Sequence, residues 1–291
     1  MSFAAEGPVA RGLPGGRLHL RHGPIDVVLR AWGAPAAVAH AHAAAVARFR
    51  TVLGELVGEL PELRKAMSDR PRVEGAVARR MVAACRPHQV FVTPMAAVAG
   101  AVADELLAAM TVAALLEKAF VNDGGDIALH LAAGATMSIG VAADFSGGPV
   151  PAINGRAVLR PEDGIGGIAT SGRHGRSFSL GIADSVTVLA RDAAGADAAA
   201  TLIANAVDLP GHPAIRRTPA CALDPDSDLG DRPVTVSVGP LAPDEIAAAL
   251  AAGRARAEAM RAESLIRDAA LMLGGETVAV GRLAIVASRP T

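Results

Sequence analysis

The stretch FVNDGGDIALHL, residues 120–131, places two glycines and two aspartates between two runs of sheet-forming residues. The apolar residues on either side predict strands near 119–122 and 126–132. Gly124 and Gly125 supply the positive φ that a tight turn needs. Two interpretations remain open: an ordinary hairpin, or a turn whose backbone approaches a ligand phosphate while Asp126 accepts a hydrogen bond or helps to hold a cation.

Outward from this stretch, helical spacing dominates on the N-terminal side and strand signals dominate on the C-terminal side. Helices are predicted at 35–60, at 73–86 and from 94 to about 110, with a short buried strand at 90–94. Two strands joined at His22-Gly23-Pro24 are predicted within 18–33. Clustered helices followed by strands favour an α+β fold over alternating βαβ units.

Beyond the hairpin, period-two segments and Gly/Pro punctuation predict further short strands. They fall at 136–143, 155–160, 166–170, 176–181, 185–190 and 234–239, with two more within 276–287. Helices are predicted at 194–207 and 242–262, and 209–231 is predicted to be a Pro/Asp-rich connection. We expect a flexible tail over 1–17 and a single domain over 18–291.

Composition limits the classes of function. Half of the 291 residues are hydrophobic, but the chain has one Trp, six Phe and no Tyr, so the core is aliphatic and no tyrosine can act in catalysis. The net charge is −1 with both signs mixed along the chain, which predicts no nucleic-acid partner. The N-terminus lacks the apolar segment of a signal peptide, and the apolar stretch 94–117 is interrupted by charges. We therefore expect a cytoplasmic protein with no membrane partner.

Three further segments offer groups suited to a ligand. The segment GIATSGRHGRS, 167–177, presents backbone N–H groups, hydroxyls and guanidinium groups to anionic oxygen, although an ordinary polar loop would look the same. Asp197 and Thr201 are four apart on a predicted helix, where they could share Mg²⁺ or Asp197 could cap the helix. Gly100 allows close helix packing, and Asp104 needs a partner or a wet cleft.

The order of these segments resembles the ApbE superfamily of flavin transferases. The motifs AVAGAVADELL, VNDGGDI, GIATSG, SVTVLA and DAAAT follow one another over residues 90–207. With TSGRHGRSFSLGIADSVTV and the PDSDLG of 225–230, the chain resembles the uncharacterised, soluble ApbE-related branch of bacteria and archaea. The resemblance implies a T-fold-like α+β architecture with antiparallel sheets, packed helices and an internal duplication.

The resemblance also implies an activity and a set of site residues. ApbE proteins split FAD and transfer FMN to a Ser or Thr of a target protein, with Mg²⁺ held partly by an Asp-x-x-x-Thr pair. Here that pair is Asp197 and Thr201. The implied lining of the nucleotide site consists of Gly100, Asp104, Asn122, Gly124, Gly125, Asp126, Thr170, Ser171, Gly172, Arg173 and Arg176.

Two departures from the family pattern concern catalysis. The transferases carry a Lys before the helix Gly, whereas this chain has Ala99-Gly100. They also carry a His-x-x-Asp-Pro-x-Thr-Gly segment that supplies a proposed base, and this chain lacks it. His174 is the candidate replacement, with Arg173 and Arg176 restoring positive charge.

Three functions stay open from the sequence. The first is a Mg²⁺-dependent flavin or nucleotide enzyme using FAD or FMN, and the second is a non-catalytic protein that binds a nucleotide or another small anion. The third is a thiol-based sulfur relay through Cys85 or Cys221. Small-residue helices and edge strands are also compatible with a homodimer.

Overall fold

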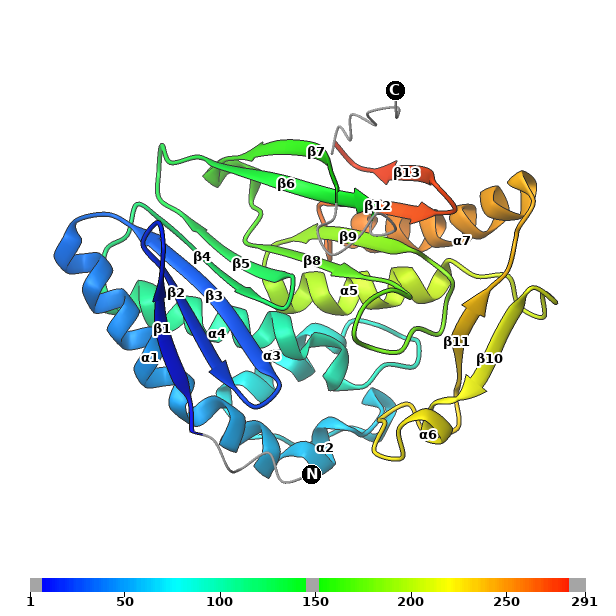
Figure 1. Ribbon diagram of the computed structural model, residues 1–291, viewed down its shortest axis with the longest axis horizontal. Helices are drawn as coiled ribbons and strands as arrows, with labels where there is room; N and C mark the ends of the chain where they lie inside the picture. The colour runs from blue at the N-terminus through cyan, green and yellow to red at the C-terminus, as the bar shows by residue number, and fades with distance from the viewer. Residues whose placement is uncertain (1–6, 145–151, 283–291) are drawn as a thin grey trace. The chain divides into compact units, whose positions relative to one another are not determined.

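The computed structural model describes residues 7–144 and 152–282 of the chain (Figure 1). These residues divide into two compact units. The first comprises the described parts of Met1–Met137, Leu159–Ala169 and Ala190–Ala198. The second comprises those of Ser138–Val158, Thr170–Leu189 and Ala199–Thr291. The two units are described in turn.

The first unit contains an antiparallel sheet in which five successive strands lie side by side (Figure 1). The strands are β1 (Val9–Leu13), β2 (Arg17–His22), β3 (Ile25–Trp32), β4 (Lys118–Asp123) and β5 (Asp126–Leu131). A further strand, β8 (Gly167–Ser171), pairs with β5 in antiparallel register. The chain crosses to the second unit within β8, after Ala169.

Alternation of buried and more exposed residues on the central strands β3 and β4 gives this sheet one core face. On β3, for example, Val27 and Leu29 are fully buried, whereas Asp26, which precedes Val27 in the strand, is exposed. The buried face packs against helices α1 (Pro35–Gly58) and α4 (Val98–Ala113). The sheet is therefore covered by helices on one side, as its period-two sequence predicts.

The remaining elements of the first unit are short. They are α2 (Leu60–Leu63), η1 (Met67–Asp69), α3 (Ala76–Cys85), η2 (Pro94–Ala97), η3 (Pro161–Asp163) and the first turns of α5 (Ala193–Ala206). Among the described residues, one helical stretch, Pro94–Ala113, is long and apolar enough by composition to cross a membrane, with a mean hydropathy of 1.6. The core helix of a soluble protein passes the same test, and this stretch packs against strands and helices of the unit.

The second unit contains three smaller strand groups. Strands β9 (Ser185–Ala190), β12 (Asp268–Leu273) and β13 (Glu276–Val280) lie side by side, with α7 (Pro243–Ala262) packed on β12 and β13. Two strand pairs complete the unit: β6 (Met137–Asp144) with β7 (Ala152–Leu159), and β10 (Ile215–Pro219) with β11 (Pro233–Val238). A short helix, α6 (Ala220–Leu223), follows β10.

The α+β prediction is confirmed, since a large antiparallel sheet and seven α-helices occur in the described chain. The internal duplication and the single domain over 18–291 stay predictions. The flexible tail that we predicted over 1–17 is wrong from Val9 onward, because β1 pairs with β2 there. Residues 1–6 lie outside the described residues.

Two predicted strands do not form. Residues 90–93 form a loop that leads into η2: the backbone oxygen of Val92 accepts a hydrogen bond from the N–H of Met67 at the start of η1, and no partner strand lies beside it within the described chain. The 176–181 segment turns instead of extending, with the Ser179 hydroxyl bonded to the backbone of Gly181. Both segments have the composition of a strand, but neither forms a strand's backbone hydrogen bonds with a neighbouring strand in the described chain.

Two boundaries near the C-terminus also differ from prediction. The connection 209–231 contains β10 and α6, which its Pro and Asp content concealed. Of the two strands predicted within 276–287, one forms, β13 at Glu276–Val280. Strand β12, Asp268–Leu273, precedes that range and was not predicted; a turn at Gly274 and Gly275 joins it to β13. Residues from 283 onward lie outside the described chain.

Candidate functional site

The turn between β4 and β5 is a two-residue hairpin. Gly124 has φ of 64° and Gly125 has φ of 117°, and Asp123 pairs directly with Asp126 across the turn. The side-chain oxygen of Asn122 accepts a hydrogen bond from the N–H of Gly125 at 2.9 Å. Asn122 and both glycines therefore build a hairpin turn, and their approach to a ligand stays a prediction.

Two carboxyl groups of the hairpin lie on the helix-covered face of the sheet. Asp123 and Asp126 share this face with Val121 and Ala128, as the alternation of buried residues requires. Asp123 is only 4% exposed. Burial of a carboxylate is unfavourable unless hydrogen bonds or a cation compensate for the lost water. This strand end therefore brings two carboxyl groups to the same face of the sheet.

Asp197, in the first half of α5, lies within electrostatic reach of both hairpin aspartates. Burial of its carboxyl group raises its pKa well above the usual value, and the charges of Asp126 and Asp123 raise it further. One carboxylate oxygen accepts a hydrogen bond from the N–H of Gly100 on α4 at 3.1 Å, which opposes the rise. Three carboxyl groups of the first unit thus influence one another.

Asp104 finds its partner at the start of α5. Its two oxygens accept hydrogen bonds from the N–H groups of Ala193 at 3.0 Å and Ala194 at 2.9 Å. Burial raises the pKa of Asp104 to about 6, even though both hydrogen bonds lower it. The carboxylate satisfies N–H groups that would otherwise lack an acceptor at a helix start.

Gly100 brings α4 and the start of α5 into close contact. A Cβ at this position would lie 2.3 Å from the backbone oxygen of Ala193 and 2.8 Å from the nitrogen of Ala194. Neither backbone atom can move without displacing α5. Glycine is therefore required here for helix packing, whichever ligand the site takes.

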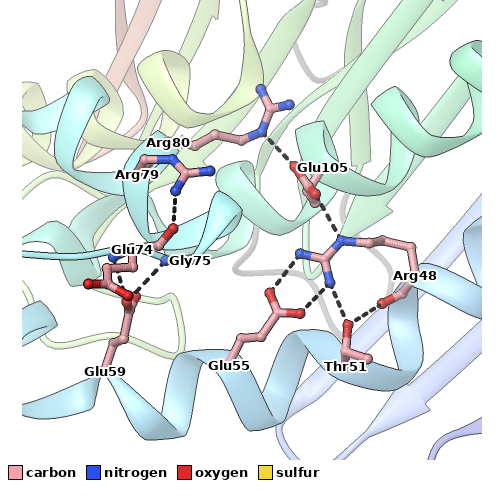
Figure 2. A network of polar contacts seen from close by, with 9 residues as sticks. All are labelled: Arg48, Thr51, Glu55, Glu59, Glu74, Gly75, Arg79, Arg80 and Glu105. Atoms are coloured by element: carbon pink, nitrogen blue, oxygen red, sulfur yellow. Dashed lines mark hydrogen bonds and ion pairs between the residues drawn. The ribbon is translucent and has the colours of Figure 1, made fainter.

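Glu105, next to Asp104 on α4, connects this helix to α1 and α3. Its oxygens accept hydrogen bonds from Arg48 at 2.8 Å and Arg80 at 3.0 Å, and Arg48 also forms a two-bonded pair with Glu55 (Figure 2). Burial acts to raise the pKa of Glu105, but the bonds from Arg48 and Arg80 hold it below the usual value. This network ties α1, α3 and α4 together.

The Thr-Ser-Gly segment belongs to the second unit from Thr170 onward. The Thr170 hydroxyl lies 2.9 Å from that of Thr187 on β9, and a Cβ on Gly172 would lie 2.4 Å from the backbone oxygen of Asp184. Ser171 is half-buried and Arg176 is exposed. The segment is thus fixed against the start of β9, with its arginine toward solvent.

Asp184 organises the loop that follows this segment. One of its oxygens lies 2.6 Å from Nη2 of Arg173 and 3.3 Å from Nε2 of His174, whereas the other accepts the N–H of Gly274 at 2.7 Å. The His174 side chain is 48% exposed. A carboxylate that contacts an imidazole can orient it, which suits the proposed role of His174 as a base.

The first unit brings together four of the predicted site residues: Gly100, Asp104, Asp126 and Asp197. Thr201 follows Asp197 about one turn later on α5. The second unit brings Arg173 and His174 together at Asp184. Site assignments for all these residues stay predictions.

Sequence reasoning missed Asp123 and Asp184 as members of these clusters. Asp123 could have been found from the hairpin register, which places it opposite Asp126. Asp184 carries no local signal, because its partners precede it by ten residues or follow it by ninety. Within the described residues, no group of three His, Cys, Asp or Glu side chains is close enough to hold a metal ion by itself.

The two cysteines lie in unreactive surroundings. Cys85 is fully buried on α3 and donates to the backbone oxygen of Thr93 at 3.4 Å, and burial raises its thiol pKa strongly. Cys221 donates to Asp231 at 3.0 Å, and this hydrogen bond raises its thiol pKa. Neither thiol is poised as a thiolate, which counts against a sulfur relay.

Comparison with known proteins gives the family. The family model described as "AbpE bacteria" matches residues 10–279. A UPF0280 protein of Methanothrix thermoacetophila is 41% identical over 133 residues, which are 45% of this chain and 52% of the relative. UPF0280 protein MK0206 of Methanopyrus kandleri is 35% identical over 165 residues, 56% of this chain and 63% of the relative.

The matched regions thus span between half and two thirds of the length of these relatives. Among solved structures, the apo form of the flavinyl transferase ApbE of Pseudomonas stutzeri aligns over 95% of both chains, with 12% identity and a TM-score of 0.38. Since the family model covers residues 10–279, this chain belongs to the AbpE family of bacteria.

Proposed function

We propose that the protein binds a flavin nucleotide together with Mg²⁺ and transfers FMN from FAD to a Ser or Thr of a target protein. The observation that carries the proposal is the buried carboxyl group of Asp197 in the first unit, whose pKa is raised by burial and further by the charges of Asp126 and Asp123. Three mutually repelling carboxyl groups, one with a strongly raised pKa, favour either a proton or a bound cation between them.

The available donors suit Mg²⁺. This ion prefers carboxylate and hydroxyl oxygens, takes few protein ligands and completes its shell with water and phosphate oxygens. Asp197 would supply a carboxylate oxygen and Thr201 a hydroxyl.

The same charges explain why nucleotide binding would depend on the cation. A pyrophosphate group near three carboxylates is repelled unless a cation lies between them. When bound, Mg²⁺ would neutralise charge that develops on the phosphate oxygens. Gly100 would hold Asp197 through its N–H, and Asp104 would fix the start of the helix that carries Asp197.

Within the second unit, taken by itself, His174 is the residue that we propose as a general base, because the Asp184 carboxylate lies beside its ring. Arg176 is exposed and offers positive charge to an anion, whereas Arg173 is paired with Asp184. These residues are the candidates for the roles of the family Lys and His segment that the chain lacks.

Release of AMP from FAD tests this activity without knowledge of the target, with water taking the place of the target hydroxyl so that free FMN forms together with AMP. The purified chain is incubated with FAD and Mg²⁺, AMP is quantified by chromatography, and any FMN on protein Ser or Thr is sought by mass spectrometry. We expect AMP release that is lost in Asp197→Ala and strongly reduced in His174→Ala. Asp69→Ala, an exposed carboxylate of the same unit, serves as the matched control.

A non-catalytic nucleotide-binding protein is the second candidate, favoured by Ala99 in place of the family Lys. It predicts Mg²⁺-dependent binding of FAD, FMN or ADP with neither AMP release nor an FMN adduct. Binding without turnover in the wild-type chain would therefore select this function over FMN transfer. No binding with or without Mg²⁺ would exclude both.

A further inference from the structure

The face of the first unit's sheet that is turned away from α1 and α4 carries a cluster of cations. Alternation places five basic side chains there, from four adjacent strands: Arg11, Arg17, Arg21, Arg30 and Lys118. Arg11, Arg17 and Arg21 are exposed, and Arg30 and Lys118 are half-exposed. These five residues form what we call the outer cationic face.

The positive charge of this face is not balanced within it. Asp26 is the carboxylate that these strands turn outward, and it lies 2.9 Å from Nε2 of His19 instead of pairing with Arg21 opposite it in the register. None of the five cations forms an ion pair with a carboxylate of the described chain. The hydrogen bonds of Arg17 and Lys118 go to backbone oxygens of Pro14 and Thr136.

Two of the cations oppose each other directly. Arg17 on β2 and Arg30 on β3 are cross-strand partners in the register. Like charges at directly opposed positions weaken a strand pair, and a carboxylate at either position would strengthen it. A sheet that tolerates this arrangement without an internal counter-charge is suited to an anion from outside the chain.

The aromatic residues of the same face decide which kind of anion fits. Trp32 and Phe120 lie with ring centroids 6.0 Å apart, on adjacent strands. The guanidinium carbon of Arg30 lies 4.3 Å from the Trp32 ring centroid, and Nζ of Lys118 lies 5.2 Å from it. Single-stranded nucleic acids need open rings on which bases stack, and here cations already cover the indole.

We propose that the outer cationic face binds an extended acidic polypeptide segment of another protein. Four adjacent strands span about 15 Å at roughly 4.8 Å per step, which corresponds to about five residues of extended chain. Carboxylates along such a segment would lie against the five cations and remove the repulsion between Arg17 and Arg30. The inference stands on the charge and register of this sheet and is independent of the nucleotide site.

Trp32 makes the test specific to this face, because it is the single tryptophan of the chain. A ten-residue polyglutamate peptide is titrated into the full chain at low salt, and binding is followed through Trp32 emission and through anisotropy of the labelled peptide. Polylysine, a ten-residue single-stranded DNA and anionic phospholipid vesicles are titrated in parallel. The variant Arg11→Glu/Arg21→Glu reverses two exposed charges of the face, and Arg50→Glu/Arg256→Glu reverses two elsewhere.

The proposal predicts that polyglutamate binds, changes Trp32 emission and dissociates as salt is raised. We expect affinity to fall about tenfold or more in Arg11→Glu/Arg21→Glu, and to stay within about twofold of wild type in the control. Absence of polyglutamate binding, equal loss in both variants, or binding without any change in Trp32 emission would overturn it. Tighter binding of the DNA or the vesicles through the same face would also overturn it, in favour of that ligand.

Discussion

Asp104 on α4 and Asp197 on α5 each bind the beginning of the other's helix. Asp104 accepts the N–H groups of Ala193 and Ala194, and Asp197 accepts that of Gly100. The positive end of each helix dipole thus meets a carboxylate carried by its neighbour. The position of Asp197, the proposed cation ligand, therefore depends on the packing of this helix pair.

The pKa of Asp104, raised to about 6, predicts a specific pH dependence of stability. A carboxyl group whose pKa is higher in the folded state than its ordinary 3.8 binds protons preferentially in that state. The stabilisation of the folded state by protonation of Asp104 is complete below pH 3.8 and is lost as pH rises through 6. Between pH 4.5 and 7, wild type should lose about 2 kcal/mol more unfolding free energy than Asp104→Asn.

Urea unfolding of both proteins at the two pH values measures this difference, with Asp69→Asn as the exposed control. Equal pH dependence in wild type and Asp104→Asn would contradict the assignment of the raised pKa to Asp104.

Close contact at Gly100 predicts a large penalty for a single methyl group. Gly100→Ala places a Cβ 2.3 Å from the backbone oxygen of Ala193, so the chain should lose about 2–3 kcal/mol of unfolding free energy or fail to fold. Gly54→Ala on α1 is the matched control, because nothing lies within 4 Å of its Cβ. That substitution should raise stability by about 0.5–1 kcal/mol. Similar thermal unfolding of the two variants would contradict the helix packing.

The ion pairs of Glu105 predict a loss of stability that disappears in acid. Glu105→Gln leaves Arg48 and Arg80 without their shared partner and should lower the unfolding free energy by about 1–3 kcal/mol at pH 7. Because the pKa of Glu105 is lowered in the folded state, its contribution is present above its ordinary pKa and is lost as pH falls. Wild type and variant should converge near pH 3. Glu258→Gln, in an exposed pair with Arg254, should change stability by under about 0.5 kcal/mol at either pH.

Thiol reactivity is expected to separate the two cysteines. Cys85 should resist iodoacetamide until the chain unfolds, because the thiol is buried and its pKa is strongly raised. Cys221 should react slowly in the folded protein and faster in Asp231→Asn, which removes the acceptor that raises its thiol pKa. Peptide-resolved mass spectrometry reports both rates. Rapid alkylation of Cys85 in the native state would restore the sulfur-relay hypothesis.

The sequence predicted those parts of the fold that rest on local patterns. The glycine pair 124–125 between period-two segments identified the β4–β5 hairpin, and helical spacing identified α1, α4 and α5. The prediction of a strand at 90–94 was wrong, because a strand forms only beside a partner strand and local composition does not show whether a partner is present. Asp104 was expected to need a partner, but its contact with Ala193, 89 residues away, depends on tertiary packing. For the same reason, the network around Arg48 and Glu105 has no local signature (Figure 2).

Calorimetric titration of FAD in the presence and absence of Mg²⁺ tests the central claim most directly. We expect Mg²⁺ to tighten FAD binding by about tenfold or more in wild type and in Asp69→Asn, because the cation offsets the carboxylates around Asp197. In Asp197→Asn the Mg²⁺ effect should vanish, while thermal unfolding shows that the variant stays folded. FAD binding that is indifferent to Mg²⁺ in wild type, or a Mg²⁺ effect that survives in folded Asp197→Asn, would contradict the account.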